Sequence, residues 1–272
     1  MCAIFKISRS GYYAWRKCPE RKRKKEDVML MPIVTRVFEN SRRTYGTRRI
    51  GTILEEMHFP IGRRRTRRLM DMQGLYPQTA KAFRHGTTTR SKNPKKTPDL
   101  VNRDFTASAP NRLWTGDITE VPTLEGVLYL AIIEDLFSRF IVGWSMMSRK
   151  VVMLVLVAFR MACARRTPIP DGCIFHTDKG SQYDCGEFRA ALEESHFCQS
   201  MGSTGDCYDN AVTESAIGTI KSECLFEKDF DTRNRARSCI FEYIESFYNR
   251  ERRHSSLGNL SPEEFERRWR GA

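Results

Sequence analysis

Hydrophobic residues between positions 27 and 76 recur at the three- and four-residue spacing of amphipathic helices. One apolar stripe covers residues 28–38, and a second helix is predicted over residues 47–57. The proline and glycine in residues 58–62 end that helix, because both residue types interrupt helices. A third helix is predicted over residues 63–73. Short helices joined by a tight turn are typical of a helix-turn-helix unit.

The predicted third helix carries five arginines within six positions. Like charges this close repel each other by roughly 0.2–0.5 kcal/mol per pair, so an anionic partner is favoured over a merely solvated cationic surface. We expect Leu69 and Met72 to face inward and the arginine face to contact DNA. The candidate DNA-binding residues of this helix are Arg63, Arg64, Arg65, Arg67 and Arg68.

From residue 111 the pattern becomes strand-like. Short apolar runs predict strands over residues 113–119, 127–133, 140–144, 173–177 and 197–200. Longer runs predict helices over residues 151–165, 186–195 and 232–249, and a further helix that begins near residue 209 or 210. Three consecutive strands followed by alternating helix and strand predict an α/β domain with a mixed five-stranded sheet.

These patterns divide the chain into five predicted segments. They are a basic N-terminal segment (1–26), a helix-turn-helix-like DNA-binding domain (27–84), a basic linker rich in turn-forming residues (85–108), an α/β core (109–228) and a C-terminal helical extension of that core (229–272). A small all-α domain therefore precedes the sheet domain.

Charge is distributed unevenly between these segments. The first 100 residues carry 25 Lys and Arg against 8 Asp and Glu, a net charge of +17, whereas the remaining residues have a net charge of −4. A basic front half joined to a mildly acidic back half indicates a polyanion-binding part and a separate part with another task.

The cysteine content and the apolar runs bear on location. Nine cysteines, an odd number with no Cys-x-x-Cys pair, predict reduced thiols and no disulfide framework. Cysteine and histidine are too dispersed for a compact zinc site. The longest apolar run, residues 151–159, is far shorter than the roughly 20 residues of a membrane span. We expect a soluble cytoplasmic protein without a signal peptide or membrane partner.

Three acidic residues stand in distinctive settings. Asp117 lies within or at the end of the first predicted strand, and Asp178 directly follows the fourth. Neighbouring strand ends converge in space, where open α/β sheets place their sites. Glu214 lies on a predicted helix after a glycine-containing loop, from which it can approach the sheet. Carboxylates on separate elements are what a two-metal phosphoryl-transfer site needs.

Sequence spacing alone does not identify these acids. The same separation of 36 positions also joins Asp99 to Asp135, Asp135 to Asp171, Glu187 to Glu223 and Asp206 to Glu242. Each acid could also be a helix cap or a surface charge, and only the shared strand and helix context favours the three. Hard oxygen ligands predict two Mg²⁺ or Mn²⁺ ions per site.

Two further residues accompany the acids. Lys221 lies seven residues after Glu214 and so projects from the same helix face, where a cation could hold a phosphate of DNA. A solvated lysine is the alternative. His176 points to the same face as Asp178, although a packed core histidine explains it equally well.

Long motifs across nearly the whole chain resemble the transposases of bacterial insertion sequences of the IS-three group. Those of the core are Trp114-x-x-Asp117-Ile-Thr119, Asp135-x-x-Ser138-Arg139, His176-x-Asp178-x-Gly180-Ser-Gln-Tyr183, Gly205-Asp-Cys-Tyr-Asp-Asn-Ala211-x-x-Glu214 with Lys221, and Tyr248-Asn-x-x-Arg252-x-His254. Upstream, Tyr45-Gly-x-Arg48-Arg49-Ile50 resembles the helix-turn-helix-like segment of the same family.

The resemblance implies a ribonuclease-H-like fold with a catalytic Asp-Asp-Glu site shared with retroviral integrases. Asp117 would bridge two metal ions, and Asp178 and Glu214 would each hold one. In the implied reaction the ends of the element are hydrolysed, and the freed 3′-hydroxyl then attacks another phosphodiester. The matching basic residues Arg48, Arg49, Arg252 and His254 become further candidate DNA contacts.

The family also implies partners. These are double-stranded DNA, both terminal inverted repeats and target DNA, and further copies of the chain assembled on that DNA near the bacterial nucleoid. Fusion by frameshifting to an upstream helix-turn-helix reading frame is implied as well.

Two alternatives remain open from the sequence. A catalytically inactive DNA-binding remnant or regulator would keep the acids only as fold residues, although all three are intact. An Asp-Asp-Glu nuclease of another class, such as a phage or plasmid integration enzyme, would not require the helix-turn-helix segment or the motif that begins at Tyr248.

Overall fold

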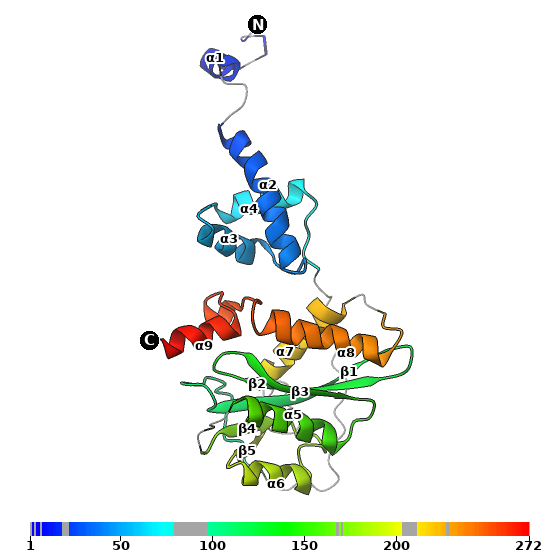
Figure 1. The fold of residues 1–272 in the computed structure, drawn as a ribbon. Coiled ribbons are helices and arrows are strands. Elements are labelled where there is room, and N and C mark those ends of the chain that lie inside the picture. The colour runs from blue at the N-terminus through cyan, green and yellow to red at the C-terminus, as the bar shows by residue number, and fades with distance from the viewer. Residues whose placement is uncertain are drawn as a thin grey trace. The chain divides into compact units, whose positions relative to one another are not determined.

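The computed structural model describes residues 2, 4–5, 7–17, 22–78, 97–166, 169, 171–202, 211–226 and 229–271. The chain divides into two compact units, Met1–Gln78 and Thr79–Ala272 (Figure 1).

The N-terminal unit is helical. Its helices are α1 (Arg9–Lys17), α2 (Lys22–Asn40), α3 (Thr47–Glu56) and α4 (Arg63–Met72). The last three pack on one another around buried Val34, Phe38, Ile50 and Leu54. All three predicted helices are confirmed. Helix α2 begins several residues earlier than its apolar stripe, because its first residues are lysines and arginines, which favour helix.

The predicted inward face of α4 is wrong at one position. Leu69 and Met70 are buried, whereas Met72 is 59% exposed. The buried stripe of this helix is centred on Thr66, so Leu69 lies at its edge. Met72 follows Leu69 by three positions. Successive helical residues are rotated by about 100°, so the side chain of Met72 lies about 120° from the centre of the buried stripe.

The second unit contains a five-stranded mixed sheet among its described residues, in the spatial order β3-β2-β1-β4-β5. The strands are β1 (Leu113–Val121), β2 (Leu128–Asp135), β3 (Phe140–Met147), β4 (Ile174–Thr177) and β5 (Cys198–Met201). β1 is antiparallel to β2, and β2 to β3, whereas β4 is parallel to both of its neighbours. The predicted sheet is confirmed, and β1 occupies its centre.

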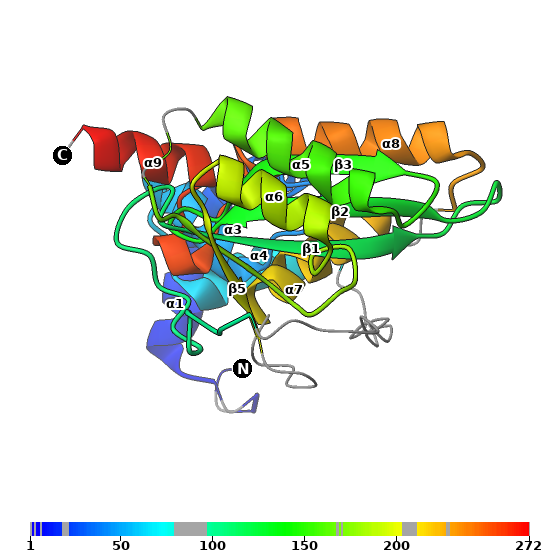
Figure 2. The same cartoon turned by 90° about the horizontal axis from the view of Figure 1, so that it is seen from below.

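Helices cover both faces of this sheet. α5 (Val152–Arg165) and α6 (Gly186–Glu194) lie on one face, and α7 (Ala211–Ile220) and α8 (Arg233–Glu242) lie on the other (Figures 1 and 2). α5 packs closely against β3 at Gly143, where a Cβ atom would stand 2.2 Å from the carbonyl oxygen of Ala158. Buried Trp114, Phe159 and Phe175 fill the layer beneath α5 and α6.

Helices α7 and α8 both continue into π-helical segments. These are η2 (Lys221–Leu225) after α7 and η3 (Tyr243–Tyr248) after α8. A short 3-10 turn, η4 (Ser255–Leu257), and a last helix, α9 (Pro262–Arg270), follow. π-Helical turns inside longer helices are frequent at functional sites.

Part of the predicted linker packs on the sheet domain. Residues 85–96 lie outside the described residues, but Val101 is buried in a cluster with Leu113 and Leu136. The backbone amide of Leu100 donates a hydrogen bond to Ser200 Oγ at 2.9 Å. The segment has no periodicity because single apolar residues between turns anchor it.

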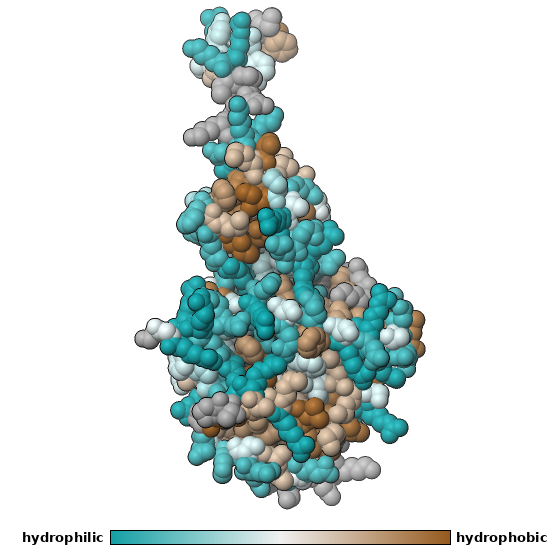
Figure 3. Space-filling model, in the orientation of Figure 1, coloured by the Kyte–Doolittle hydropathy of each residue, from teal (hydrophilic) through white to brown (hydrophobic). Residues whose placement is uncertain are grey.

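The surface shows hydrophilic and apolar residues interspersed, with an apolar patch over α2 and α4 in the N-terminal unit (Figure 3). Val28 and Met29 are the exposed large apolar residues of α2. Among the helices that the structure describes, none is both long enough and apolar enough to cross a bilayer.

Candidate functional site

The strand register brings Asp117 and Asp178 together. β1 and β4 are parallel, and their last paired residues are Gly116 and Thr177. Asp117, still within β1, and Asp178, directly after β4, each occupy the next position. β4 ends there, whereas β1 continues along β2 to Val121. Two carboxylates therefore lie where one strand stops beside a longer neighbour.

Backbone amides hold both carboxylates. Ile118 donates its backbone N–H to Asp117 Oδ1 at 2.7 Å, and Gly180 donates its own to Asp178 Oδ1 at 3.0 Å. A Cβ atom on Gly180 would stand 2.9 Å from the same Asp178 oxygen, closer than such contacts normally are. The glycine of the His176-to-Tyr183 motif is therefore required by the orientation of Asp178.

The pKa of Asp117 is affected by a third acid, Glu214. Burial raises it to about 7, with further contributions from the negative charges of Asp178 and Glu214, while the Ile118 amide and the Lys150 ammonium act in the opposite direction. Glu214 is partly buried on α7, and α7 packs against β1. Asp178 and Glu214, the other two acids predicted from the sequence, therefore each act electrostatically on Asp117.

The donor set is incomplete as the structure describes it. Within the described ranges, no group of three Asp, Glu, His or Cys side chains stands close enough to hold one ion. Residues 203–210, which precede α7 and its Glu214, lie outside those ranges.

Tyr183 is a site residue that the sequence reasoning did not single out. It is 2% exposed, and its hydroxyl oxygen lies 3.4 Å from the point where a Gly116 Cβ would stand. Burial raises its pKa well above the usual value, and the charges of Asp117 and Asp178 raise it further. Its position five residues after Asp178, in the same motif, was the available signal.

Two lysines surround the acids. Lys221 begins η2, directly after α7, and is partly buried. Burial lowers its pKa, while the negative charges of Asp117 and Glu120 act in the opposite direction. Lys150 precedes α5, and its carbonyl oxygen accepts a 3.4 Å hydrogen bond from Gln182 Nε2. No spacing in the sequence indicated Lys150.

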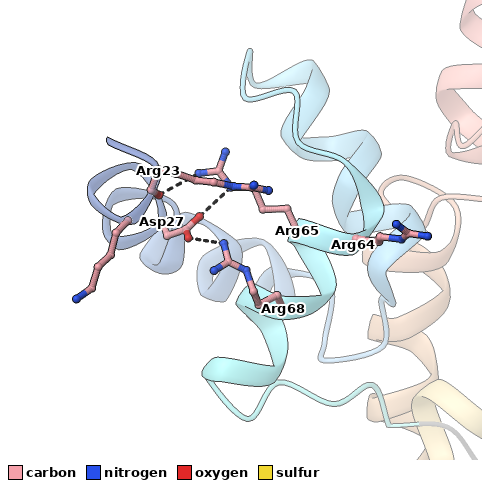
Figure 4. Close-up of a pocket in the computed structure, with 6 residues that line it drawn as sticks. Arg23, Asp27, Arg64, Arg65 and Arg68 are labelled. Atoms are coloured by element: carbon pink, nitrogen blue, oxygen red, sulfur yellow. Dashed lines mark hydrogen bonds and ion pairs between the residues drawn. The ribbon is translucent and has the colours of Figure 1, made fainter. Parts of the chain in front are cut away.

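The arginines of α4 divide into two groups (Figure 4). Arg65 Nε donates to Asp27 Oδ1 at 2.8 Å, its Nη2 pairs with Glu26 Oε2 at 3.1 Å, and Arg68 also pairs with Asp27. Burial alone would raise the pKa of Asp27, but the two arginines bring it below its ordinary value. Acids of α2 thus compensate part of the predicted charge repulsion.

The remaining α4 arginines face outward. Arg63, Arg64 and Arg67 are exposed, and Figure 4 shows Arg64 pointing away from Asp27. A groove of about 560 Å³ lies along α2 and α4. Its lining residues are Arg23, Lys24, Asp27, Arg64, Arg65 and Arg68. On α3, Arg48 is exposed, whereas the Arg49 guanidinium lies 5.1 Å above the Tyr45 ring.

Two predicted DNA contacts lie inside the protein. Arg252 and His254 are 5% and 9% exposed. Arg252 forms a bidentate pair with Glu223, with Nε–Oε2 and Nη2–Oε1 distances of 2.8 and 2.7 Å. Its guanidinium also lies 5.7 Å from the Tyr248 ring centre. The motif from Tyr248 to His254 therefore joins η3 to η2, a role for which a bidentate arginine is well suited.

The motif that begins at Asp135 is also internal. Asp135 accepts backbone hydrogen bonds from Asn111 at 2.9 Å and Phe137 at 3.1 Å. Ser138 donates to Glu266 of α9, which pairs with buried Arg166. Asp135 therefore stabilises a turn and is not part of the group around Asp117.

Comparison with known proteins covers both units. Residues 107–207 and 197–262 match families described as integrase core domain, and residues 24–83 match one described as HTH-like domain. An uncharacterized 31 kDa protein of insertion element IS600 from Shigella sonnei is 42% identical over 99% of this chain and 98% of its own length. Transposase InsF for insertion sequence IS3A from Escherichia coli is 37% identical over 98% of this chain and 92% of its own length.

Similarity to solved structures concerns the fold. A simian T-cell lymphotropic virus intasome, solved by cryo-electron microscopy with a phosphatase regulatory subunit, contains a chain that aligns with 79% of this one at a TM-score of 0.50. The alignment covers 73% of that chain at 13% identity. The sheet and its helices thus have the fold of an integrase core, which is ribonuclease-H-like.

Proposed function

Because this chain belongs to the IS3 family of insertion-sequence transposases, we propose that it cleaves the DNA ends of its element and joins them to another DNA. The observation that supports this most is the parallel register of β1 and β4, in which Asp117 and Asp178 follow the last pair side by side. Glu214, which raises the pKa of Asp117, would be the third acid.

In this proposal Asp117, Asp178 and Glu214 hold two Mg²⁺ or Mn²⁺ ions. The residues fit such ions, because their donors are hard carboxylate oxygens. Burial and, to a lesser extent, the charges of Asp178 and Glu214 raise the pKa of Asp117, and a bound divalent cation would stabilise its charged form. When bound, the ions would activate a water or 3′-hydroxyl and neutralise charge on the phosphate.

The surrounding residues would orient the acids and the DNA. The amides of Ile118 and Gly180 fix one oxygen of Asp117 and one of Asp178. Tyr183 excludes water from beneath them. Lys221, beside Asp117, would contact a phosphate near the cut, because an ammonium on the edge of an acidic cluster attracts the backbone without competing for metal.

Duplex DNA would bind the N-terminal unit through its outward-facing cations. The proposed contacts are Arg48, Arg63, Arg64 and Arg67, with Arg23 and Lys24 of α2 beside them. Arg65 and Arg68 would brace α4 against Asp27, and Arg49 would stack on Tyr45. Arg252 and His254 would not belong to this surface, because both are buried.

We also propose that copies of the chain assemble on the terminal inverted repeats and the target DNA, in the bacterial cytoplasm, and that the active form is fused by frameshifting to an upstream reading frame. The InsF relative is a transposase for an insertion sequence, and the structural neighbour is an intasome.

The test is cleavage and joining of terminal-repeat DNA with Mg²⁺, using the frameshift-fused protein if this frame alone is inert. Asp117→Asn should reduce the rate by at least about 10²–10³, by analogy with the loss of one transition-state donor. Asp171→Asn, a change at an exposed acid, is the matched control and should retain activity. Full activity in a folded Asp178→Asn or Glu214→Gln variant would overturn the assignment.

A further inference from the structure

Two thiols face each other between η2 and α8. The Sγ atoms of Cys224 and Cys239 are 3.6 Å apart, although 15 positions separate the residues in sequence. Each sulfur also lies against the other residue's carbonyl oxygen, at 3.7 and 3.9 Å. A disulfide needs sulfurs about 2.05 Å apart, so a further approach of about 1.5 Å would suffice. Small side-chain rotations on two packed helices provide that distance.

The two thiols differ in access. Cys224 is 1% exposed, whereas Cys239 on α8 is partly exposed. An oxidant from solvent can therefore reach Cys239 first, whereas Cys224 is shielded from solvent. This is the arrangement of an attacking thiol and a resolving thiol. Cys163 and Cys173 are less suited to make the first attack on an oxidant, because burial raises the pKa of Cys163 to about 11 and that of Cys173 further.

We propose that Cys224 and Cys239 form a reversible disulfide when the protein meets a hydroperoxide. The Cys239 thiolate attacks the outer peroxide oxygen, the O–O bond breaks, and a sulfenic acid forms as an alcohol or water leaves. The Cys224 thiolate then attacks that sulfur, the S–O bond breaks, and water leaves. The two cysteines lose two electrons and the hydroperoxide gains them.

The bond would fix one helix to another. η2 continues α7, and its first residue is Lys221, while α8 leads into η3. A link between residues 224 and 239 would hold the end of the α7–η2 helix against α8. This proposal does not depend on the proposed catalytic role of α7, and its readouts are chemical and thermal.

The reduced full-length chain is treated with hydrogen peroxide, alkylated with N-ethylmaleimide and digested with trypsin without reduction. We expect the peptides 222–228 and 238–250 to appear linked by mass spectrometry. The melting temperature should rise by about 5 °C, because the bond closes a 15-residue separation in the unfolded chain. Dithiothreitol should reverse both changes.

Serine variants separate the two roles. Cys224→Ser should stop at the sulfenic acid of Cys239, which dimedone traps, and Cys239→Ser should leave Cys224 a thiol. Cys198→Ser, at an exposed cysteine of β5, is the control and should retain the cross-link. Peptides 222–228 and 238–250 that stay unlinked while Cys198 is oxidised would overturn the proposal, as would a disulfide from Cys239 to any other cysteine.

Discussion

At the scale of single residues, the orientation of Asp178 depends on a missing side chain. Gly180 donates its amide to Asp178 Oδ1, and the close approach leaves no space for a Cβ atom. The same reasoning applies to Gly116, where a Cβ would stand 3.0 Å from the Phe175 ring. Neither glycine has a positive φ, so backbone conformation does not require glycine at these positions. The close contacts with neighbouring atoms are the reason for it.

We predict that Gly180→Ala lowers the rate of strand cleavage about ten- to a hundredfold, because displacing a carboxylate by a fraction of an ångström disturbs positioning. DNA affinity should not change. Gly186→Ala is the matched control, since a Cβ atom there would have no neighbour within 4 Å and alanine favours the start of α6. Equal rates for the two variants, measured on terminal-repeat DNA, would contradict the prediction.

A second residue-scale effect concerns Glu134. It is 1% exposed, accepts a 3.3 Å hydrogen bond from the Tyr248 hydroxyl, and burial raises its pKa to about 7. An acid whose pKa is higher in the folded state binds protons there preferentially. Its contribution to stability is therefore complete below about pH 4.5 and is lost as the pH rises to about 7.

We predict that Glu134→Gln reduces the fall in stability between about pH 4.5 and 7, by up to about 3 kcal/mol. Glutamine keeps the acceptor for Tyr248 but does not titrate. Melting temperatures measured from pH 5 to 8 test this. Glu187→Gln, on the exposed side of α6, should follow the unsubstituted protein. A Glu134→Gln profile with the original slope would show that this acid is not the titrating group.

At the scale of elements, helix α4 performs two tasks with one residue type. Arg65 and Arg68 face α2 and pair with Asp27, whereas Arg63, Arg64 and Arg67 face solvent. The helical period separates them, since residues three apart share a face. The sequence could count these arginines but could not assign the faces, because the acids that select Arg65 and Arg68 lie on another helix.

We predict that removing Arg64 or Arg67 weakens duplex binding and lowers the slope of log affinity against log salt by about 0.9 for each phosphate that is no longer neutralised. Stability should be nearly unchanged. Arg65→Ala should instead lower stability by about 1–3 kcal/mol, because it leaves the Asp27 carboxylate with a single arginine. Fluorescence anisotropy at several salt concentrations and thermal melts distinguish the two effects. Identical behaviour of Arg64→Ala and Arg65→Ala would refute the division.

At the scale of the whole molecule, the basic part of the sequence extends past the boundary between the two compact units. Residues 1–100 carry the net charge of +17, and the N-terminal unit ends at Gln78. The second unit includes Val101 and Phe105, which pack with Leu113. The boundary between the units therefore lies before the point where the change from helical to strand pattern is visible.

We predict that a fragment of residues 97–272 folds but binds duplex DNA at least about tenfold more weakly than the whole chain at low salt, since most phosphate contacts are removed. A fragment of residues 111–272 should be less stable, because it loses buried Val101. Affinity and melting temperature are measured for both. A 97–272 fragment that binds as tightly as the whole chain would place the DNA-binding surface elsewhere.

The sequence by itself determined the order of the elements and their class. Apolar period, proline and glycine positions identified α3, α4 and the strands closely, because these signals are local. The apolar runs also placed Asp117 in the first strand and Asp178 directly after the fourth, and the structure confirms both positions.

Only the tertiary structure decided which charges are internal. Arg252 and Arg65 look like exposed cations in sequence, yet Glu223 and Asp27 pair with them across distances of 29 and 38 positions. The pKa of Asp117 and the contact between Cys224 and Cys239 likewise arise between separate elements. Burial and pairing depend on contacts between residues far apart in sequence, and a local sequence pattern does not specify which residue will be the partner.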